Sequence, residues 1–117
     1  SGGDLVLVGF SQGTMMALHT ALRRETAPAG VLGYSGALAG PERLKQEMTA
    51  KPPILLIHGD QDEVLPVGMT LMAAQGLCAA GHGAEFHISQ GIPHSIGPDG
   101  LELGQRFIET ALAGKLA

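Results

Sequence analysis

The sequence predicts an α/β fold in which a parallel sheet of about four strands is flanked by helices. Short aliphatic runs alternate four times with longer stretches of helical periodicity. The clearest run, Ile54–His58, has no polar alternation, which is typical of a parallel strand buried on both faces. Repeated strand–helix units of this length place the strands in parallel, with right-handed crossovers between them.

Each expected strand is a short apolar run that ends where turn residues or a new helical pattern begin. The first strand, Leu5–Val8, ends at Gly9, and the second covers Val31–Ser35. The third is Ile54–His58, and the fourth is Ala84–Ser89. The carboxyl ends of parallel strands meet at one edge of the sheet, where such folds carry their catalytic loops.

The expected helices follow the strands in turn. They cover Gln12–Arg24, Pro41–Ala50, Val67–Ala80 and Pro98–Ala113. Proline begins two of them, where its missing N–H is not needed, and Gly81 ends the third as a left-handed cap. In the last helix we expect four apolar residues on the inner face, namely Leu101, Ile108, Ala111 and Leu112.

Length and composition narrow the class of protein. The 117 residues fit a single domain, 1–117, in which residues 1–3 are interpreted as a cloning remnant or a flexible end. Charged residues make up 15% and hydrophobic residues 44%, which argues against intrinsic disorder. The seven basic residues are scattered and outnumbered by eleven acidic ones, which argues against nucleic-acid binding. No apolar stretch is long enough for a membrane span, and the single cysteine, Cys78, fits a cytoplasmic location.

The segment Gly9-Phe10-Ser11-Gln12-Gly13 is a G-x-S-x-G motif between the first strand and the first helix. In this context the motif predicts a tight, strained turn that holds the serine above the sheet edge, with the flanking glycines relieving steric conflict. The helix N-terminus there also favours negative charge. A glycine-rich turn with an incidental serine is the alternative, but the strand before and the helix after favour a nucleophile.

Candidate partners for Ser11 follow the third and fourth strands. Asp60 and Asp62 come after the third strand, and either could orient a histidine, although aspartate is also common in turns. His94 follows the fourth strand and is the candidate base. No further ligands follow the two aspartates at calcium-loop spacing, so we expect neither a metal nor a cofactor.

The other histidines are interpreted as ordinary structural residues. His19 falls within a helix, His82 in a turn and His87 within a strand, and no zinc pattern joins them to Cys78. His58, at the end of a strand, is expected to pack or to form a local hydrogen bond.

The order Ser, Asp, His is the chain order of the α/β-hydrolase triad. Together, residues 9–13, His58-Gly59-Asp60-Gln61-Asp62 and Gly91-Ile92-Pro93-His94-Ser95 resemble the phospholipase/carboxylesterase family of α/β-hydrolases, which includes acyl-protein thioesterases. The resemblance runs from Asp4 to about Leu112. It implies that Ser11 is the nucleophile, His94 the base and Asp62 the triad acid, with Asp60 shaping the loop. Thr14 stands where the family usually has a second glycine, which is a mild departure.

The resemblance implies a serine hydrolase that cleaves small carboxylic esters or thioesters through an acyl-enzyme. The backbone N–H of Gln12 would supply one donor of the oxyanion hole. Phe10, Val64 and Ile92 are the expected substrate-binding residues. The alternative for such apolar residues is ordinary core packing.

The resemblance further implies that the chain is the C-terminal half of an α/β-hydrolase fold. The second oxyanion donor would then lie on the other half, so the hole in this chain would be incomplete. The first strand would have an unpaired edge, through which we expect self-association or pairing with an N-terminal half. Two alternatives are a catalytically inactive, oligomerising fragment that retains the triad residues, and a dienelactone hydrolase, which Ser11 disfavours because that group typically uses cysteine.

Overall fold

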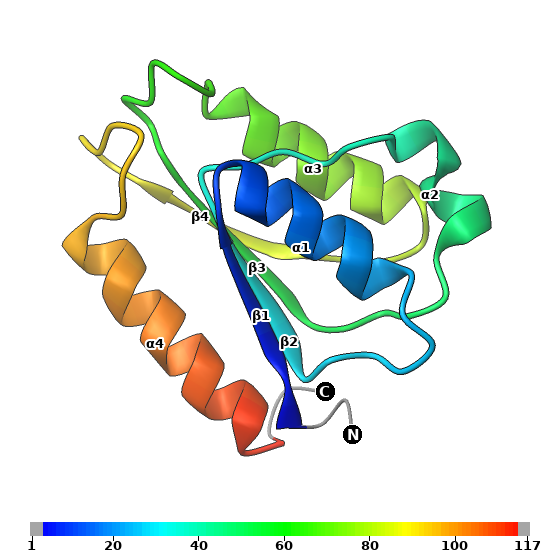
Figure 1. Ribbon diagram of the computed structural model, residues 1–117. Helices are drawn as coiled ribbons and strands as arrows, with labels where there is room; N and C mark the ends of the chain where they lie inside the picture. Colours follow the sequence, from blue (N-terminus) through cyan, green and yellow to red (C-terminus); the bar gives the residue numbers. More distant parts are fainter. Residues whose placement is uncertain (1–3, 115–117) are drawn as a thin grey trace.

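A four-stranded, fully parallel sheet forms the centre of the protein, in a computed structural model that describes residues 4–114 (Figure 1). The strands are β1 (Val6–Phe10), β2 (Gly30–Tyr34), β3 (Ile54–Gly59) and β4 (Glu85–Ser89), and they lie side by side in chain order. This arrangement confirms the predicted α/β class. The interpretation of residues 1–3 lies outside the described residues.

Helices cover both faces of the sheet, three on one face and one on the other. They are α1 (Gln12–Leu22), α2 (Pro41–Glu47), α3 (Gly68–Ala79) and α4 (Pro98–Leu112). The first three pack on one face, and α4 crosses the other face alone (Figure 1). The helices on both faces agree with the expectation from the sequence.

Two apolar layers on opposite faces of the sheet make up the core. Strands β2 and β3 are buried along their whole length, which explains why Ile54–His58 shows no polar alternation. Alternate side chains of these strands point to opposite faces. Val31 and Leu56 pack under α1–α3, whereas Leu32 and Ile57 pack under α4.

The buried face of α4 agrees in part with the predicted one, because Ala111 is buried and Ile108 packs against the core as expected. Leu101 is 61% exposed and Leu112 is 50% exposed, so the expectation was wrong for these two residues. Gly100 and Gly104 face the sheet instead, because Tyr34 rises between them. The Tyr34 hydroxyl donates a hydrogen bond of 2.9 Å to the Gly100 carbonyl, and a Cβ on Gly104 would overlap that hydroxyl.

The β1 side of the sheet leaves apolar surface open. Strand β1 is an end strand of the sheet order, and it pairs only with β2 among the described residues. Val8 is 54% exposed on β1, and Ile96 and Leu101 lie beside it around a groove of about 460 Å³. An apolar groove along an open strand edge is a surface suited to association.

Candidate active site

The turn between β1 and α1 holds Ser11 in a strained backbone conformation. Ser11 has φ 57° and ψ −118°, a region that residues with a side chain rarely occupy, and it is the N-cap of α1. Its backbone N–H donates to the Tyr34 carbonyl at 2.9 Å, which ties the turn to β2. The serine therefore lies at the carboxyl edge of the sheet, as the motif predicts.

The two glycines of the motif have different environments. A Cβ on Gly9 would lie 2.5 Å from backbone atoms of Gly13 and Thr14, so only glycine allows the helix to approach β1 this closely. A Cβ on Gly13 would meet nothing within 4 Å. Both glycines were expected to relieve steric conflict. Among the described residues this is confirmed for Gly9 and was wrong for Gly13.

Thr14 has a structural role that the sequence reading did not predict. It is buried, and its hydroxyl donates to the Tyr34 carbonyl at 2.8 Å, the same oxygen that accepts from Ser11. Gly33 and Gly36 leave room for its side chain, since a Cβ on either would lie within 2.6 Å of it. The departure from the family pattern is thus accommodated and adds one bond to the turn.

Ser11, His94 and Asp62 form a continuous hydrogen-bonded chain. His94 Nε2 lies 3.1 Å from Ser11 Oγ, and His94 Nδ1 lies 2.6 Å from Asp62 Oδ2. A carboxylate only accepts, so Nδ1–H donates to Asp62, and in the neutral ring Nε2 accepts from the Ser11 hydroxyl. This is the relation of nucleophile, base and orienting acid in a serine hydrolase.

Asp62 is buried, and its charge is stabilised by hydrogen bonds. Burial on its own would raise the pKa of Asp62, but the hydrogen bonds from His94 and from the Leu65 and Val64 N–H groups, with the nearby His94 charge, lower it overall. Both N–H groups donate to Oδ1 at 2.8 Å. The carboxylate is therefore ionised at neutral pH, with Oδ2 left for His94.

The loop that carries His94 is docked on the segment after β3. The Gly91 N–H donates to Asp60 Oδ1 at 2.7 Å, and the Gln61 N–H donates to the Ile92 carbonyl at 3.0 Å. A Cβ on Gly59 would lie 2.1 Å from that carbonyl oxygen, so glycine is needed for the contact. Of the two aspartates, Asp62 contacts His94 and Asp60 shapes the loop.

The remaining predicted residues lie at different distances from Ser11 and His94. The ring of Phe10 packs against the His94 imidazole, with centroids 4.9 Å apart and an angle of 49° between the planes. Val64 is 66% exposed in the turn after Asp62. The side chain of Ile92 contacts Gly97 and so packs within its own loop. The Gln12 N–H belongs to the first turn of α1, where helices leave N–H groups without an intrahelical partner.

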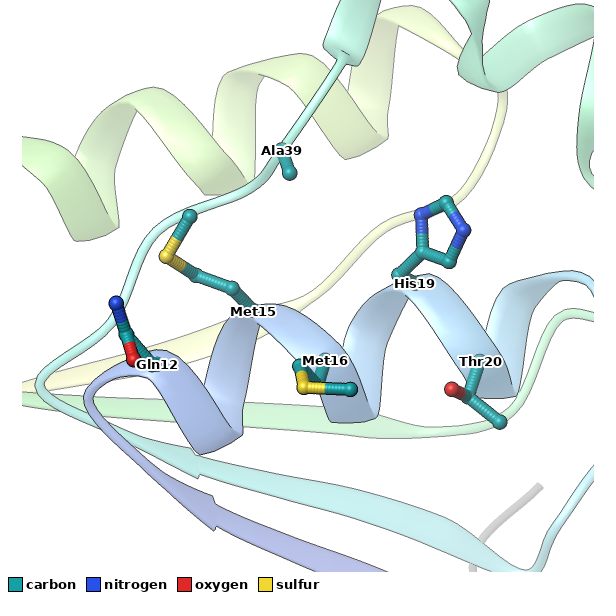
Figure 2. A pocket seen from close by; sticks show the side chains of 6 residues that line it. All are labelled: Gln12, Met15, Met16, His19, Thr20 and Ala39. Atoms are coloured by element: carbon teal, nitrogen blue, oxygen red, sulfur yellow. The ribbon is translucent and has the colours of Figure 1, made fainter.

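An apolar groove is lined at one point by Gln12, the residue after Ser11. It has a volume of about 410 Å³ and runs between α1 and the segment that carries Ala39, toward which Met15 and His19 point (Figure 2). Met16, which also lines it, is 69% exposed. The lining of the groove does not include Asp62 or His94.

Three other histidines have structural partners. His58 is buried and bonds to Leu65 and Thr70 beside the Asp62 turn, which confirms the expectation that it packs or forms a local hydrogen bond. Its link to the turn that holds Asp62 was not predicted, and its place four residues before Asp62 in the sequence is the signal that could have indicated it. His87 pairs with Asp99 at 2.6 Å, and His82 bonds to the Pro52 carbonyl.

Within residues 4–114, no group of three His, Cys, Asp or Glu side chains could hold a metal ion. No helix of this same range is long and apolar enough to cross a membrane.

Comparisons with known proteins find one family model and several relatives. A family model described as Phospholipase/Carboxylesterase matches residues 2–112. Acyl-protein thioesterase 1 of Saccharomyces cerevisiae is 35% identical over 116 residues, covering 94% of this chain and 51% of that protein. The crystal structure of esterase PE8 is 44% identical with a TM-score of 0.90, covering 95% of this chain and 52% of that one.

A further relative is named as an inactive protein. A "probable inactive carboxylesterase" of Oryza sativa is 27% identical, covering 93% of this chain and 46% of that protein. The chain spans about half the length of the curated relatives it matches.

Proposed function

Because the chain belongs to the phospholipase/carboxylesterase family of α/β-hydrolases, we propose that it carries the catalytic triad of a serine hydrolase that cleaves carboxylic esters or thioesters. The observation that carries the proposal is the chain of contacts from Ser11 Oγ through His94 to Asp62, at 3.1 Å and 2.6 Å. The three residues come from three separate loops at one sheet edge, so local folding of any one loop does not account for their alignment.

The reaction proceeds through an acyl-enzyme. His94 Nε2 takes the proton of the Ser11 hydroxyl while Oγ attacks the carbonyl carbon of the substrate. The tetrahedral intermediate collapses, the alcohol or thiol leaves with the proton from His94, and the acyl group stays on Oγ. Water then attacks with His94 again as the base, which releases the acid and restores Ser11. Asp62 orients the imidazole and stabilises its charged form.

The oxyanion hole in this proposal has one donor among the described residues, the backbone N–H of Gln12. The α1 N-terminus adds a favourable dipole for the developing negative charge. Loss of one of two donors lowers the rate by roughly 10²–10³. We therefore expect the chain alone to be slow compared with a protein that supplies a second donor.

The substrate is proposed to be a small ester or thioester with an apolar acyl group. Phe10 and Val64 are exposed beside His94 and Asp62, so both are placed to contact it. The side chain of Ile92 is used in loop packing, which makes its assignment as a binding residue the weakest of the three.

Labelling with a fluorophosphonate probe tests the proposal directly. The probe forms a bond only with an activated serine, so the chain should be labelled and the Ser11→Ala variant should not. Ser35, the other non-glycine residue with positive φ among residues 4–114, provides a matched control, and Ser35→Ala should still be labelled. A folded chain that is not labelled, or is labelled equally after Ser11→Ala, would refute the proposed activity.

The alternative of an inactive, oligomerising fragment is supported by the similarity to the relative named as inactive. It predicts a folded oligomer in which Ser11 and His94 do not interact. The separation of 3.1 Å between Nε2 and Oγ supports the catalytic proposal instead.

We also propose that the chain associates through the open side of β1, either with itself or with an N-terminal half. The unpaired edge and the exposed Val8, Ile96 and Leu101 beside it support this proposal. Light scattering at increasing protein concentration measures the size of the associated species. A monodisperse monomer at high concentration, together with no gain in activity when the other half is added, would contradict it.

A cytoplasmic location remains part of the proposal. It is supported by the free, exposed thiol of Cys78, which suits a reducing compartment. Cell fractionation tests it, and recovery from an oxidising compartment with Cys78 in a mixed disulfide would contradict it.

A further inference from the structure

His58 is a completely buried histidine beside the triad acid that the proposed mechanism does not use. It lies on β3, is 0% exposed, and both of its ring nitrogens have partners. Nδ1 lies 2.7 Å from the Thr70 hydroxyl oxygen, and Nε2 lies 2.7 Å from the Leu65 carbonyl oxygen. Thr70 is in the first turn of α3 and is also buried.

The partners define the tautomer of His58. A carbonyl oxygen can only accept, so Nε2 carries a proton and donates to Leu65. In the neutral ring Nδ1 is then an acceptor, and the Thr70 hydroxyl donates to it. Nε2 also lies 3.3 Å from Asp62 Oδ2, so the partial positive charge of this N–H group is close to the carboxylate.

The turn that His58 holds is the one that orients Asp62. The Val64 and Leu65 N–H groups both donate to Asp62 Oδ1 at 2.8 Å, which turns Oδ2 toward His94. The Leu65 residue that donates to Asp62 with its N–H is bonded through its carbonyl to His58. The orientation of the triad acid is thus linked to β3 by His58 and to α3 by Thr70.

We propose that His58 is a positioning residue, which acts through the Leu65 carbonyl and with the support of Thr70 to keep Asp62 in contact with His94. This inference rests on the proposed function of the triad. It assigns His58 no contact with substrate. A displacement of about 1 Å in a catalytic group lowers a rate by about 10². Loss of the His58 bond is expected to lower turnover by about ten- to a hundredfold.

Two conservative variants separate positioning from simple packing. The side-chain N–H group of glutamine reaches the place of Nε2, so His58→Gln retains the donor to Leu65. Asparagine is shorter and reaches only the place of Nδ1, so His58→Asn retains a partner for Thr70 and loses that donor. We expect His58→Gln to keep p-nitrophenyl ester turnover within about threefold per folded molecule. His58→Asn should lower kcat about ten- to a hundredfold with KM unchanged.

A second readout does not depend on activity. The Nδ1 proton of His94, bonded to Asp62, should give a separate low-field proton NMR signal. We expect the signal in the unaltered chain, in Ser11→Ala and in His58→Gln, and its loss or broadening in His58→Asn. Since Ser11→Ala removes labelling and retains the signal, failure of the proposed activity is distinguishable from failure of the role of His58.

His82 offers a matched control, because it also bonds to a backbone carbonyl, that of Pro52, away from the triad. His82→Asn should lower stability and leave turnover per folded molecule and the His94 signal unchanged. A folded His58→Asn with unaltered signal and turnover would overturn the proposal. If His58→Asn does not fold, Thr70→Val takes its place, since it retains the ring and removes the hydroxyl that supports it. Weakened signal and kcat in Thr70→Val would support the proposal, and unaltered values would overturn it.

Discussion

Replacement of Gly9 by alanine is expected to destabilise the turn that carries Ser11, whereas the same change at Gly13 should not. The added Cβ at Gly9 would lie 2.5 Å from the Gly13 carbonyl group and the Thr14 nitrogen, where ordinary contacts begin at 3.4 Å. The neighbours are helix backbone and cannot rotate away, so β1 and α1 must separate by about 1 Å. At Gly13 the added methyl group meets nothing within 4 Å.

The size of the effect follows from this separation. Overpacking of a rigid site lowers the free energy of unfolding by about 1–3 kcal/mol or more, and backbone neighbours place Gly9→Ala at the upper end. A shift of about 1 Å at Ser11 would also break its 3.1 Å contact with His94, which lowers the labelling rate by about 10². Gly13→Ala, in the first turn of α1, should raise the free energy of unfolding by about 0.5–1 kcal/mol.

Urea unfolding gives the stability of both variants, and fluorophosphonate labelling per folded molecule gives the reactivity of Ser11. Both measurements use the same chain under the same conditions, so each variant serves as the control for the other. Equal destabilisation by the two changes would refute the argument, because it would mean that the approach of α1 to β1 does not depend on Gly9.

Three further predictions concern Ser11, Asp62 and Phe10. Because Ser11 occupies a positive-φ region that glycine tolerates, Ser11→Gly should be about 1 kcal/mol more stable than Ser11→Ala in urea, and equal midpoints would refute backbone strain there. The pKa of Asp62 is lower in the folded protein than its ordinary value of 3.8, so the ionised carboxylate stabilises the fold at pH values above 3.8. This contribution to the free energy of unfolding is lost as the pH falls through the lower pKa of the folded state. Asp62→Asn should therefore be less stable than the parent at pH 7 and lose less stability on acidification, and parallel pH profiles would contradict this. Phe10→Leu removes an aromatic face that stabilises a charged His94 imidazole by about 0.5–1 kcal/mol, so the labelling rate should fall about two- to fivefold. Phe10→Tyr keeps the ring and should keep the labelling rate. An unchanged labelling rate in Phe10→Leu would exclude a contribution from the ring.

The α/β class and the loops that carry the candidate triad were predictable because each depends on local pattern. Continuous aliphatic runs at Ile54–His58 and its neighbours indicate buried parallel strands, and parallel strands bring their carboxyl ends to one edge. Chain order then places Ser11, Asp62 and His94 on that edge. The resemblance to a family, rather than any spacing, separated Asp62 from Asp60.

The inner face of α4 could be predicted from its apolar residues only in part, since Ile108 and Ala111 face the core as expected and Leu101 and Leu112 do not. Its periodicity favours Leu101 and Leu112, but the helix meets the sheet through Gly100 and Gly104 because the Tyr34 ring needs the space between them. That requirement arises from a residue on β2, 66 positions away from Gly100 along the chain. A helical pattern records which residues are apolar and carries no information about the shape of the surface they meet.

The sequence by itself determined the order of strands and helices, the strained serine turn and the identity of the candidate nucleophile, base and acids. These follow from propensity, periodicity and short motifs, which act over a few residues. Only the tertiary structure decided that Gly9 and not Gly13 is sterically required, that Thr14 shares the Tyr34 carbonyl with Ser11, and that His58 holds the Asp62 turn. Close packing is the physical reason, because each of these roles depends on atoms from distant segments lying within a few tenths of an ångström of contact.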